Sequence, residues 1–292
     1  MTEILICGGL LIDRYMAVDK YPGRGGDGYI LDSFDVVGGC AVNIAMTVKK
    51  LGGEPYIVSS VGNDRWGSRI MDYMRDKGLS LNCVNRIQGN TGYCFVFLEP
   101  DGERTFLTRK GCETEYSDEL IPDETANSCS VAAVTGYYLL DASSGGLLAR
   151  LNKLKDKGCK IVFDPSPLVD KIDAEYLREI LALSDIIVPN GSEAAFITGF
   201  AGKETPEQWA FSCNERSSSV IIKQGSAGGI LFENGRQARY EAANADVIDT
   251  TGAGDSFTGA IAYALGTGLS LEEGVAMAAL EAGRVVSIEG PH

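Results

Sequence analysis

The residues best suited to chemistry in this chain lie in one short run, 249–255, of sequence Asp-Thr-Thr-Gly-Ala-Gly-Asp. An apolar-alternating segment ends just before it, near Ile248, and a helix-like stretch follows. Backbone N–H groups at a helix start are unpaired and carry the positive end of the helix dipole, so small residues there favour anion binding. A carboxylate beside such a site, here Asp255, suits the removal of a proton from a nucleophilic hydroxyl. The alternative is a glycine-rich turn whose aspartate only caps a helix.

This segment resembles the C-terminal signature of the PfkB carbohydrate kinases, the ribokinase-like family. A second run, Gly-Gly-Cys-Ala-Val-Asn-Ile-Ala at 38–45, is similar to the family's N-terminal signature and is followed by Gly52 and Gly62 at the expected intervals. The two matches lie in the right order, about 210 residues apart. The resemblance extends over nearly the whole chain. It implies an ATP-dependent kinase in which Asp255 is the general base.

The same resemblance gives the glycine-rich run a role in catalysis. The backbone N–H groups of Gly252, Ala253 and Gly254 are expected to stabilise the charge that develops on the transferred phosphoryl group. The chain contains no GxxxxGK[ST] sequence, since Gly202-Lys203-Glu204 lacks the following hydroxyl. A literal GxGxxG occurs at 23–28, but a strand-like run follows it where a dinucleotide fingerprint requires a helix. Phosphate binding is therefore expected at 252–255.

Two positions after the apolar run 185–188 have two interpretations. Asn190, with Glu193 three residues later, is a variant of the capping box that starts a helix. The resemblance implies that both side chains hold Mg²⁺ through water, which suits a cation that retains much of its hydration shell. The two roles are compatible.

The substrate side is expected from residues near the N-terminus. Asp13 follows the first strand pattern, where ligands bind in open α/β sheets, and Asn43 begins a helix after Gly39. A carboxylate and an amide in one crevice can hydrogen-bond the hydroxyls of a polyol, and glycine admits the ligand closely. A surface aspartate and an ordinary polar residue at a helix start are the alternatives.

Two further sites are implied by the resemblance. The turn 223–228 borders the nucleotide, which assigns nucleotide binding to Lys223, Gly225, Ser226 and Gly228. A plain hairpin turn is the alternative there. Asp249 and Thr251 resemble positions that bind a monovalent cation, K⁺, in ribokinases. Residues beyond Gly290-Pro291-His292, where relatives usually continue, normally help to complete that site.

One departure from the family bears on the substrate. Ribokinases have a Gly-Ala-Asn/Asp segment where this chain has Gly111-Cys112-Glu113, which adds an acid near the sugar. Only Arg104 and Arg109 are basic in the neighbouring extended segment, and solvated charges are the simpler fate for them. We therefore expect a neutral or weakly charged furanose-sized polyol rather than a sugar phosphate. A sugar acid stays open.

Composition narrows the classes of partner. The chain has 292 residues and a formal net charge of −14, which disfavours nucleic acid or an anionic membrane as partner. No stretch approaches the about 20 apolar residues of a membrane span. Eight scattered cysteines without a CxxC pair indicate buried thiols in a reducing compartment, the cytoplasm. The single histidine, His292, leaves no basis for Ser-His-Asp catalysis or a histidine metal site.

The elements that must position these residues alternate between strand and helix. That alternation predicts an α/β fold, a doubly wound, mainly parallel sheet flanked by helices. Residues 14–37 and 92–109 break it with short extended patterns, which indicate a small antiparallel flap, and the resemblance implies a β lid over the substrate. We expect residues 1–13, 38–91 and 110–292 to form the core.

The strand patterns expected in the core are 4–8, 56–61, 131–135, 160–163, 185–188, 220–222 and 229–232. The expected helices are 41–51, 66–77, 145–157, 174–183, 193–198, 206–213, 255–265 and 271–287.

The sequence as a whole therefore predicts ATP-dependent phosphorylation of a hydroxymethyl group on a ribose- or fructose-like sugar. A nucleoside kinase of the same family is one alternative. A catalytically silent sugar-binding regulator is another, and the intact Asp255 argues against it. The exposed strand edges of the lid favour a homodimer formed through it.

Overall fold

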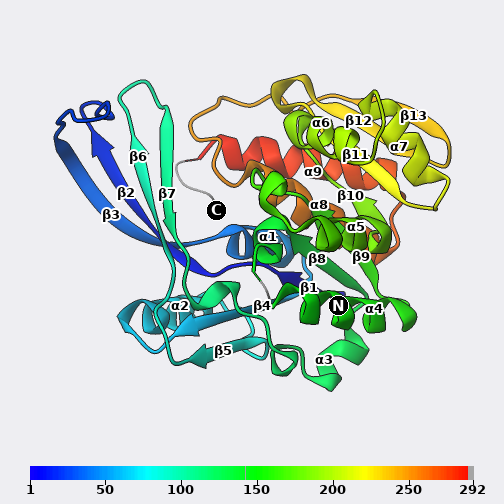
Figure 1. Cartoon of the computed structure of the whole chain (residues 1–292), viewed down its shortest axis with the longest axis horizontal. Coiled ribbons are helices and arrows are strands. Elements are labelled where there is room, and N and C mark those ends of the chain that lie inside the picture. The colour runs from blue at the N-terminus through cyan, green and yellow to red at the C-terminus, as the bar shows by residue number, and fades with distance from the viewer. Residues whose placement is uncertain (142, 289–292) are drawn as a thin grey trace.

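A computed structural model describes residues 1–141 and 143–288. Within these ranges the chain forms a nine-stranded sheet flanked by helices and a separate four-stranded sheet that projects from one side (Figure 1). In the large sheet every neighbouring pair from β11 to β5 is parallel, and β12 and β13 add antiparallel strands at one edge. The predicted α/β fold with a mainly parallel sheet is confirmed.

The strands of the large sheet, in spatial order, are β13 (Arg236–Tyr240), β12 (Gly229–Glu233), β11 (Ser219–Lys223), β10 (Ile186–Ile187), β9 (Lys160–Asp164), β8 (Val131–Thr135), β1 (Glu3–Cys7), β4 (Glu54–Gly62) and β5 (Val84–Ile87).

Two hydrophobic cores lie on the two faces of this sheet. Side chains alternate along each strand, so Leu5 and Cys7 join one core while Ile4 and Ile6 join the other. Burial on both faces explains why the parallel strands are almost wholly apolar.

The first core is covered by α3 (Asp123–Ser128), α4 (Ser144–Asp156), α5 (Ala174–Leu183), α6 (Gly191–Phe200) and α7 (Pro206–Asn214). The second is covered by α1 (Cys40–Lys50), α2 (Arg65–Asp76), α8 (Ala253–Thr267) and α9 (Leu271–Val286). Short 3₁₀ turns occur at η1 (Cys112–Thr114), η2 (Asp118–Leu120), η3 (Gly136–Leu139), η4 (Val169–Lys171) and η5 (Gly225–Ala227).

The second sheet, called the small sheet below, contains most of residues 14–37 and 92–109. Its strands, in spatial order, are β3 (Ile30–Gly38), β2 (Leu11–Val18), β6 (Tyr93–Leu98) and β7 (Arg104–Arg109).

The expectation of a wholly antiparallel flap is wrong at the centre of the small sheet, where β2 and β6 pair in parallel. The reason lies in the connection between them. The chain leaves β3, passes through α1, β4, α2 and β5, and returns to the small sheet from the large one, so β6 runs in the same direction as β2. The two hairpins, β2–β3 and β6–β7, are antiparallel as expected. A covering role over a substrate stays a prediction.

Local structure departs from expectation in a few further places. Strands β5 and β13 and helix α3 were not anticipated from the sequence. The apolar alternation that ends near Ile248 forms no strand; instead, the N–H groups of Ile248 and Asp249 donate to the carbonyl of Val286 at the end of α9. Residues 23–28 lie in the β2–β3 connection with no helix after them, so the GxGxxG match is not a dinucleotide fingerprint.

Two compositional expectations can also be compared with the structure. All eight cysteines are free thiols, and seven of them are buried. No helix among residues 1–141 and 143–288 is both long and apolar enough to cross a membrane. His292 and the run 290–292 lie outside the described residues.

Candidate active site

A cleft of about 1250 Å³ lies where several parallel strands of the large sheet end. Asp164 at the end of β9, Asn190 just after β10 and Lys223 at the end of β11 all line it, together with residues of the small sheet such as Asp13. Ligands of open α/β sheets bind at such carboxyl ends. Of the residues singled out from the sequence, the cleft is lined by Asp13, Gly39, Asn43, Glu113, Asn190, Glu193, Lys223, Gly225, Ser226, Gly228, Gly252, Ala253, Gly254 and Asp255.

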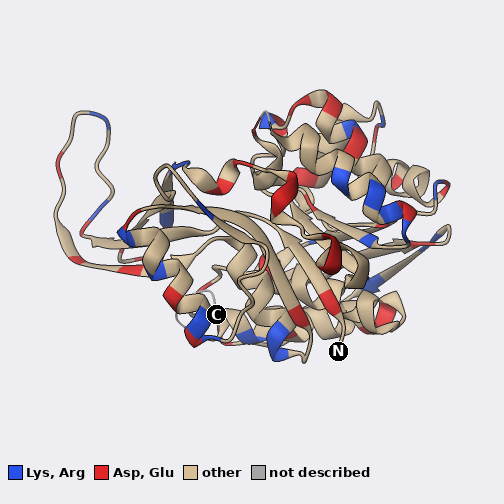
Figure 2. Cartoon of the chain, turned by 90° about the horizontal axis from the view of Figure 1, so that it is seen from below, with Lys and Arg blue, Asp and Glu red and all other residues tan. Residues whose placement is uncertain are grey.

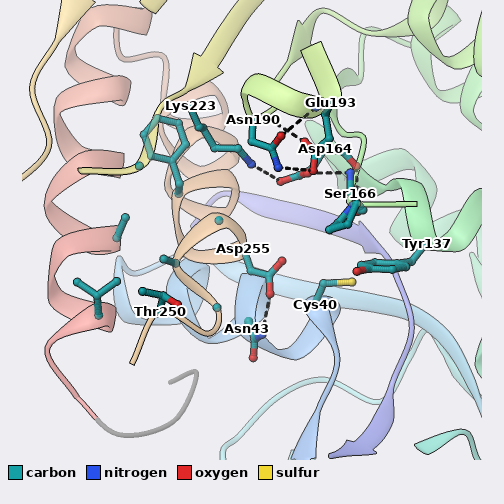
Figure 3. Close-up of a pocket in the computed structure, with 18 of the residues that line it drawn as sticks. Cys40, Asn43, Tyr137, Asp164, Ser166, Asn190, Glu193, Lys223, Thr250 and Asp255 are labelled. Atoms are coloured by element: carbon teal, nitrogen blue, oxygen red, sulfur yellow. Dashed lines mark hydrogen bonds and ion pairs between the residues drawn. The ribbon is translucent and has the colours of Figure 1, made fainter. Parts of the chain in front are cut away.

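The glycine loop, residues 249–254, leads directly into α8. Gly252 is the N-cap and has a φ of 77°, a left-handed conformation that glycine adopts without strain. Asp255 therefore stands in the first turn of α8, as the sequence predicts. Asn43 Nδ2 donates to Asp255 Oδ2 at 2.7 Å, which joins two residues 212 positions apart (Figure 3). That bond fixes the orientation of the carboxylate while leaving Oδ1 available to a ligand.

The environment of Asp255 makes it a stronger base than an ordinary aspartate. Burial raises the pKa of Asp255 to about 6, and the charge of Asp164 adds to the rise. The hydrogen bond from Asn43 and the Lys223 ammonium oppose it. A carboxylate with this pKa is ionised at neutral pH and close to the value that favours general base catalysis.

The part of the cleft around Asp13 is shaped by two glycines. A Cβ on Gly38 would lie 2.0 Å from Asp13 Oδ2, and a Cβ on Gly39, whose φ is 98°, would lie 2.4 Å from the carbonyl oxygen of Gly9. Only glycine fits either position. Burial, and then the charge of Asp255, raise the pKa of Asp13 to about 7, while a hydrogen bond from the Gly39 N–H opposes the rise.

Glu113 marks the departure from the family pattern, and the structure gives it a defined set of partners. Its carboxylate accepts from the N–H of Gly92 at 3.0 Å and from the N–H of Gly111 at 2.9 Å. Only 4% of Glu113 is exposed, and burial raises the pKa of this carboxyl. Glu113 therefore ties the entry of β6 to the exit of β7 and also presents an acid to the cleft.

Asn190 and Glu193 form the capping box of α6. Asn190 N donates to Glu193 Oε2 at 2.8 Å, and Glu193 N donates to Asn190 Oδ1 at 2.9 Å. Burial and the charge of Asp164 raise the pKa of Glu193. A cation bound nearby would reduce the repulsion between these neighbouring buried carboxylates. Carboxylate and amide oxygens also suit a hydrated Mg²⁺. Among residues 1–141 and 143–288, no group of three or more His, Cys, Asp or Glu is arranged to hold a metal by itself.

Asp164 is a site residue that the sequence reasoning missed. Its Oδ2 accepts from Lys223 Nζ at 2.9 Å, and its Oδ1 accepts from Ser166 N at 3.2 Å (Figure 3). The same Oδ2 also accepts from Thr258 Oγ1 at 2.7 Å. It thereby links β9, β11 and α8 and holds the lysine beside the glycine loop, where a Cβ on Gly254 would lie 3.6 Å from Lys223 Nζ. The sequence signal that could have identified Asp164 is its place as a carboxylate at the end of an apolar strand pattern.

A further wall of the cleft was also missed. In addition to the predicted turn 223–228, mostly small apolar side chains from 240–247 and from α9 line the cleft, and they are called the apolar slot below. These residues are Tyr240, Ala242, Ala243, Ala245, Val247, Ala279, Ala282, Gly283 and Val286. A Cβ on Gly283 would lie 2.7 Å from Ala243 Cβ, so glycine at this position allows α9 to approach the segment 242–247 closely. The sequence carried no pattern for this slot beyond a cluster of alanines.

Asp249 and Thr251 lie together, because Thr251 N donates to Asp249 Oδ1 at 2.7 Å. The same Oδ1 is 2.8 Å from Arg104 Nη2 of β7. Two unit positive charges about 4 Å apart repel by about 4 kcal/mol at an effective dielectric constant of about 20. The described residues therefore do not fit a monovalent cation on this carboxylate while Arg104 is paired with it.

The cleft therefore brings together a carboxylate of raised pKa in the first turn of α8, the glycine loop before that helix and a lysine held by Asp164. The sequence matches the family described as "pfkB family carbohydrate kinase" over residues 1–291. The chain belongs to this family of carbohydrate kinases and is a phosphotransferase.

Particular relatives agree with this membership. The Escherichia coli (strain K12) protein named "Uncharacterized sugar kinase YegV" is 29% identical over 298 residues, covering 99% of this chain and 89% of that protein. The ribokinase of Arabidopsis thaliana is 28% identical over 297 residues, covering 98% of this chain and 76% of that protein.

Solved structures show the same architecture. A structure of Arabidopsis thaliana ribokinase complexed with ribose and ATP has a TM-score of 0.82 at 26% identity and covers 99% of this chain and 93% of that one. A nucleoside kinase of Burkholderia thailandensis in complex with inosine has a TM-score of 0.82, 99% and 91% coverage, and 22% identity, which shows the fold alone.

Proposed function

We propose that this protein transfers the γ-phosphoryl group of ATP to a hydroxymethyl oxygen of a small ribose- or fructose-like sugar. The observation that carries the proposal is the position of Asp255. It stands in the first turn of α8, is held by Asn43, has a pKa raised to about 6 and faces the cleft beside Gly252–Gly254.

The sugar would lie between Asp13, Gly39 and Asn43, and its hydroxymethyl group would point toward Asp255. Asp255 accepts the hydroxyl proton as the oxygen attacks the γ-phosphorus, and the bond from that phosphorus to the bridging oxygen breaks to release ADP. The N–H groups of Gly252, Ala253 and Gly254 at the start of α8 stabilise the charge that develops on the phosphoryl oxygens. Positioning and electrostatic stabilisation supply most of the catalysis in phosphoryl transfer.

The nucleotide would lie with its base in the apolar slot and its phosphates toward the glycine loop. Lys223, held by Asp164 at 2.9 Å, would bring a positive charge to the phosphates of ATP. The turn 225–228 would border the ribose of ATP. Asn190 and Glu193 would hold Mg²⁺ through its water, and the bound ion supplies neutralisation of the polyphosphate charge.

A neutral substrate is favoured by the fate of the basic side chains. Arg104 is paired with Asp249, and the guanidinium of Arg109 lies 5.9 Å from the ring centroid of Tyr93. Lys110, which follows β7, does line the cleft, but the carboxylates of Asp13 and Glu113 line it as well. A phosphorylated sugar would add a dianion to this acidic surrounding.

A nucleoside is a second candidate because two partly exposed aromatic side chains line the cleft. Phe106 is 54% exposed and Tyr137 is 39% exposed, and both could stack on a base. Nucleic acid and anionic membranes are not favoured as partners, since the chain carries a net charge of −14 and Figure 2 shows no segment of the described chain in which basic residues alone gather. Seven buried free thiols fit the cytoplasm.

The proposal is tested by measuring ADP formation from ATP across pentoses, hexoses, ketosugar acids, nucleosides and sugar phosphates. We expect the highest kcat/KM with a neutral furanose-forming sugar. A nucleoside at the top would select the second candidate, while a sugar phosphate at the top would contradict the charge argument. No stimulation by any of them would refute the proposed function.

A further inference from the structure

An ion pair connects the small sheet to the glycine loop. Arg104 begins β7, and its Nη2 lies 2.8 Å from Oδ1 of Asp249, the first residue of the loop. The side chains are only 15% and 5% exposed, so neither charge is well solvated. Loss of one partner of a buried pair leaves the other charge uncompensated, which is costly. The small sheet and the glycine loop are therefore joined by a pair that is costly to break.

Asp249 also organises the loop that follows it. Its Oδ1 accepts from Thr251 N at 2.7 Å, and its own N–H donates to the Val286 carbonyl at 3.1 Å. These contacts fix the backbone immediately before Gly252, where α8 begins. A change at the Asp249 carboxylate is thus transmitted to the N–H groups proposed to bind the phosphoryl group.

Other basic residues near the small sheet do not share this arrangement. Arg69 of α2 reaches Asp35 of β3 at 3.8 Å, but its side chain is 49% exposed. Arg109, at the far end of β7, lies over the ring of Tyr93. The Arg69–Asp35 pair, exposed and at this long distance, contributes little to stability. Arg104 is distinguished from both by burial and by the loop it contacts.

We propose that Arg104 is a positioning residue whose guanidinium delivers, from the small sheet, the positive charge that the Asp249 carboxylate requires. Closure of the small sheet over the cleft and ordering of the glycine loop are then one event. Because the guanidinium fills the place of a monovalent cation at Asp249, turnover of this kinase needs no added K⁺. The inference rests on the proposed function for its effect on turnover.

The first experiment measures sugar-dependent ADP formation in buffers whose only monovalent cation is tetramethylammonium, with and without added KCl. Wild type should have the same kcat/KM with and without KCl. Arg104→Ala should lower kcat/KM by about tenfold or more, since a misplaced loop impairs transfer. KCl or guanidinium chloride should restore part of the loss, and Arg104→Lys should lose less. The matched control Arg109→Ala removes a guanidinium from the same strand and should respond as wild type does.

A second experiment separates this inference from the proposed function, because it needs no turnover. The melting temperature of Arg104→Ala should rise in KCl relative to tetramethylammonium chloride at equal ionic strength, as K⁺ occupies the vacated carboxylate. Wild type and Arg109→Ala should show no such difference. Strong activation or stabilisation of wild type by K⁺ would overturn the inference, as would an Arg104→Ala variant that matches Arg109→Ala in both experiments.

Discussion

Asp255 is surrounded by an amide, a lysine and a second carboxylate, and their balance sets the pH at which it can accept a proton. Its pKa is about 6, so the carboxylate is increasingly protonated, and inactive as a base, below that pH. We expect kcat/KM to fall about tenfold per pH unit on the acid side of about pH 6. A pH–rate profile measures this directly. A profile that stays flat down to the ordinary aspartate range, about pH 4, would contradict the assignment.

Asp13 illustrates how a functional carboxyl lowers stability. Its pKa in the folded protein is about 7, against about 3.9 in an unfolded chain. Between these values the folded state retains a proton that the unfolded chain has lost, so the free energy of unfolding falls as pH rises through this window. The effect is about 1.4 kcal/mol for each pH unit.

Asp13→Asn removes this penalty while preserving shape. We expect the variant to melt at a higher temperature than wild type at about pH 8. At about pH 4 the difference should be small, because the side chain at position 13 is then neutral in both folded proteins. Differential scanning calorimetry at the two pH values measures it. A gain that is equal at both pH values would show that ionisation of Asp13 is not its cause.

Glu193 has two proposed roles, and α9 offers a matched control. Glu193→Gln removes a charge from the proposed Mg²⁺ site, so the Mg²⁺ concentration for half-maximal rate should rise. Glu273 forms the same capping box with Ser270, but it is solvent-exposed and does not line the cleft. Glu273→Gln should therefore leave Mg²⁺ dependence unchanged. Equal Mg²⁺ dependence in both variants, with a lowered melting temperature, would leave helix capping as the only role of Glu193.

At the scale of elements, the sequence predicted those with a strong local signal. Helix α5 was placed at its observed ends, and α8 and α9 were placed within about two residues. Strand β13 was missed because its five residues are mostly polar and exposed, as an edge strand allows. The β2–β6 pairing could not be read locally, since it depends on the path of the chain through α1, β4, α2 and β5.

The small sheet presents large apolar side chains to solvent on its outer strands. Five of them are at least half exposed: Ile30, Leu31, Phe34, Phe106 and Leu107. Exposed apolar side chains on a sheet with open edges favour association. We expect a homodimer formed through the small sheets, measurable by light scattering at micromolar concentration.

A charge among these exposed apolar side chains should disrupt the dimer. Leu31→Glu, at a side chain that is 65% exposed, is expected to give a monomer. Leu280→Glu on α9, where the side chain is 66% exposed, is the control and should keep the oligomeric state of wild type. A wild-type protein that is monomeric and fully active would refute the predicted dimer.

At the scale of the whole molecule, the site is assembled from segments that are remote in sequence. Asn43 and Asp255 were both named from the sequence because they belong to two recognisable motifs, whereas their hydrogen bond follows only from the packing of α1 against α8. The Arg104–Asp249 pair and the Asp164–Lys223–Thr258 contacts have no local pattern at all. Sequence reasoning named Asn43, Lys223 and Asp249 but could not supply their long-range partners.

The central claim is that Asp255 is the base of a phosphoryl transfer, and Asp255→Asn tests it most directly. An asparagine can still meet Asn43, so the fold and ATP binding should be retained. Loss of the base should lower kcat by about 10²–10⁴-fold. The measurement is kcat with the best substrate of the screen, alongside ATP affinity by calorimetry. Unchanged affinity with that loss is the predicted result, and a variant that keeps more than roughly a third of wild-type kcat would contradict the account.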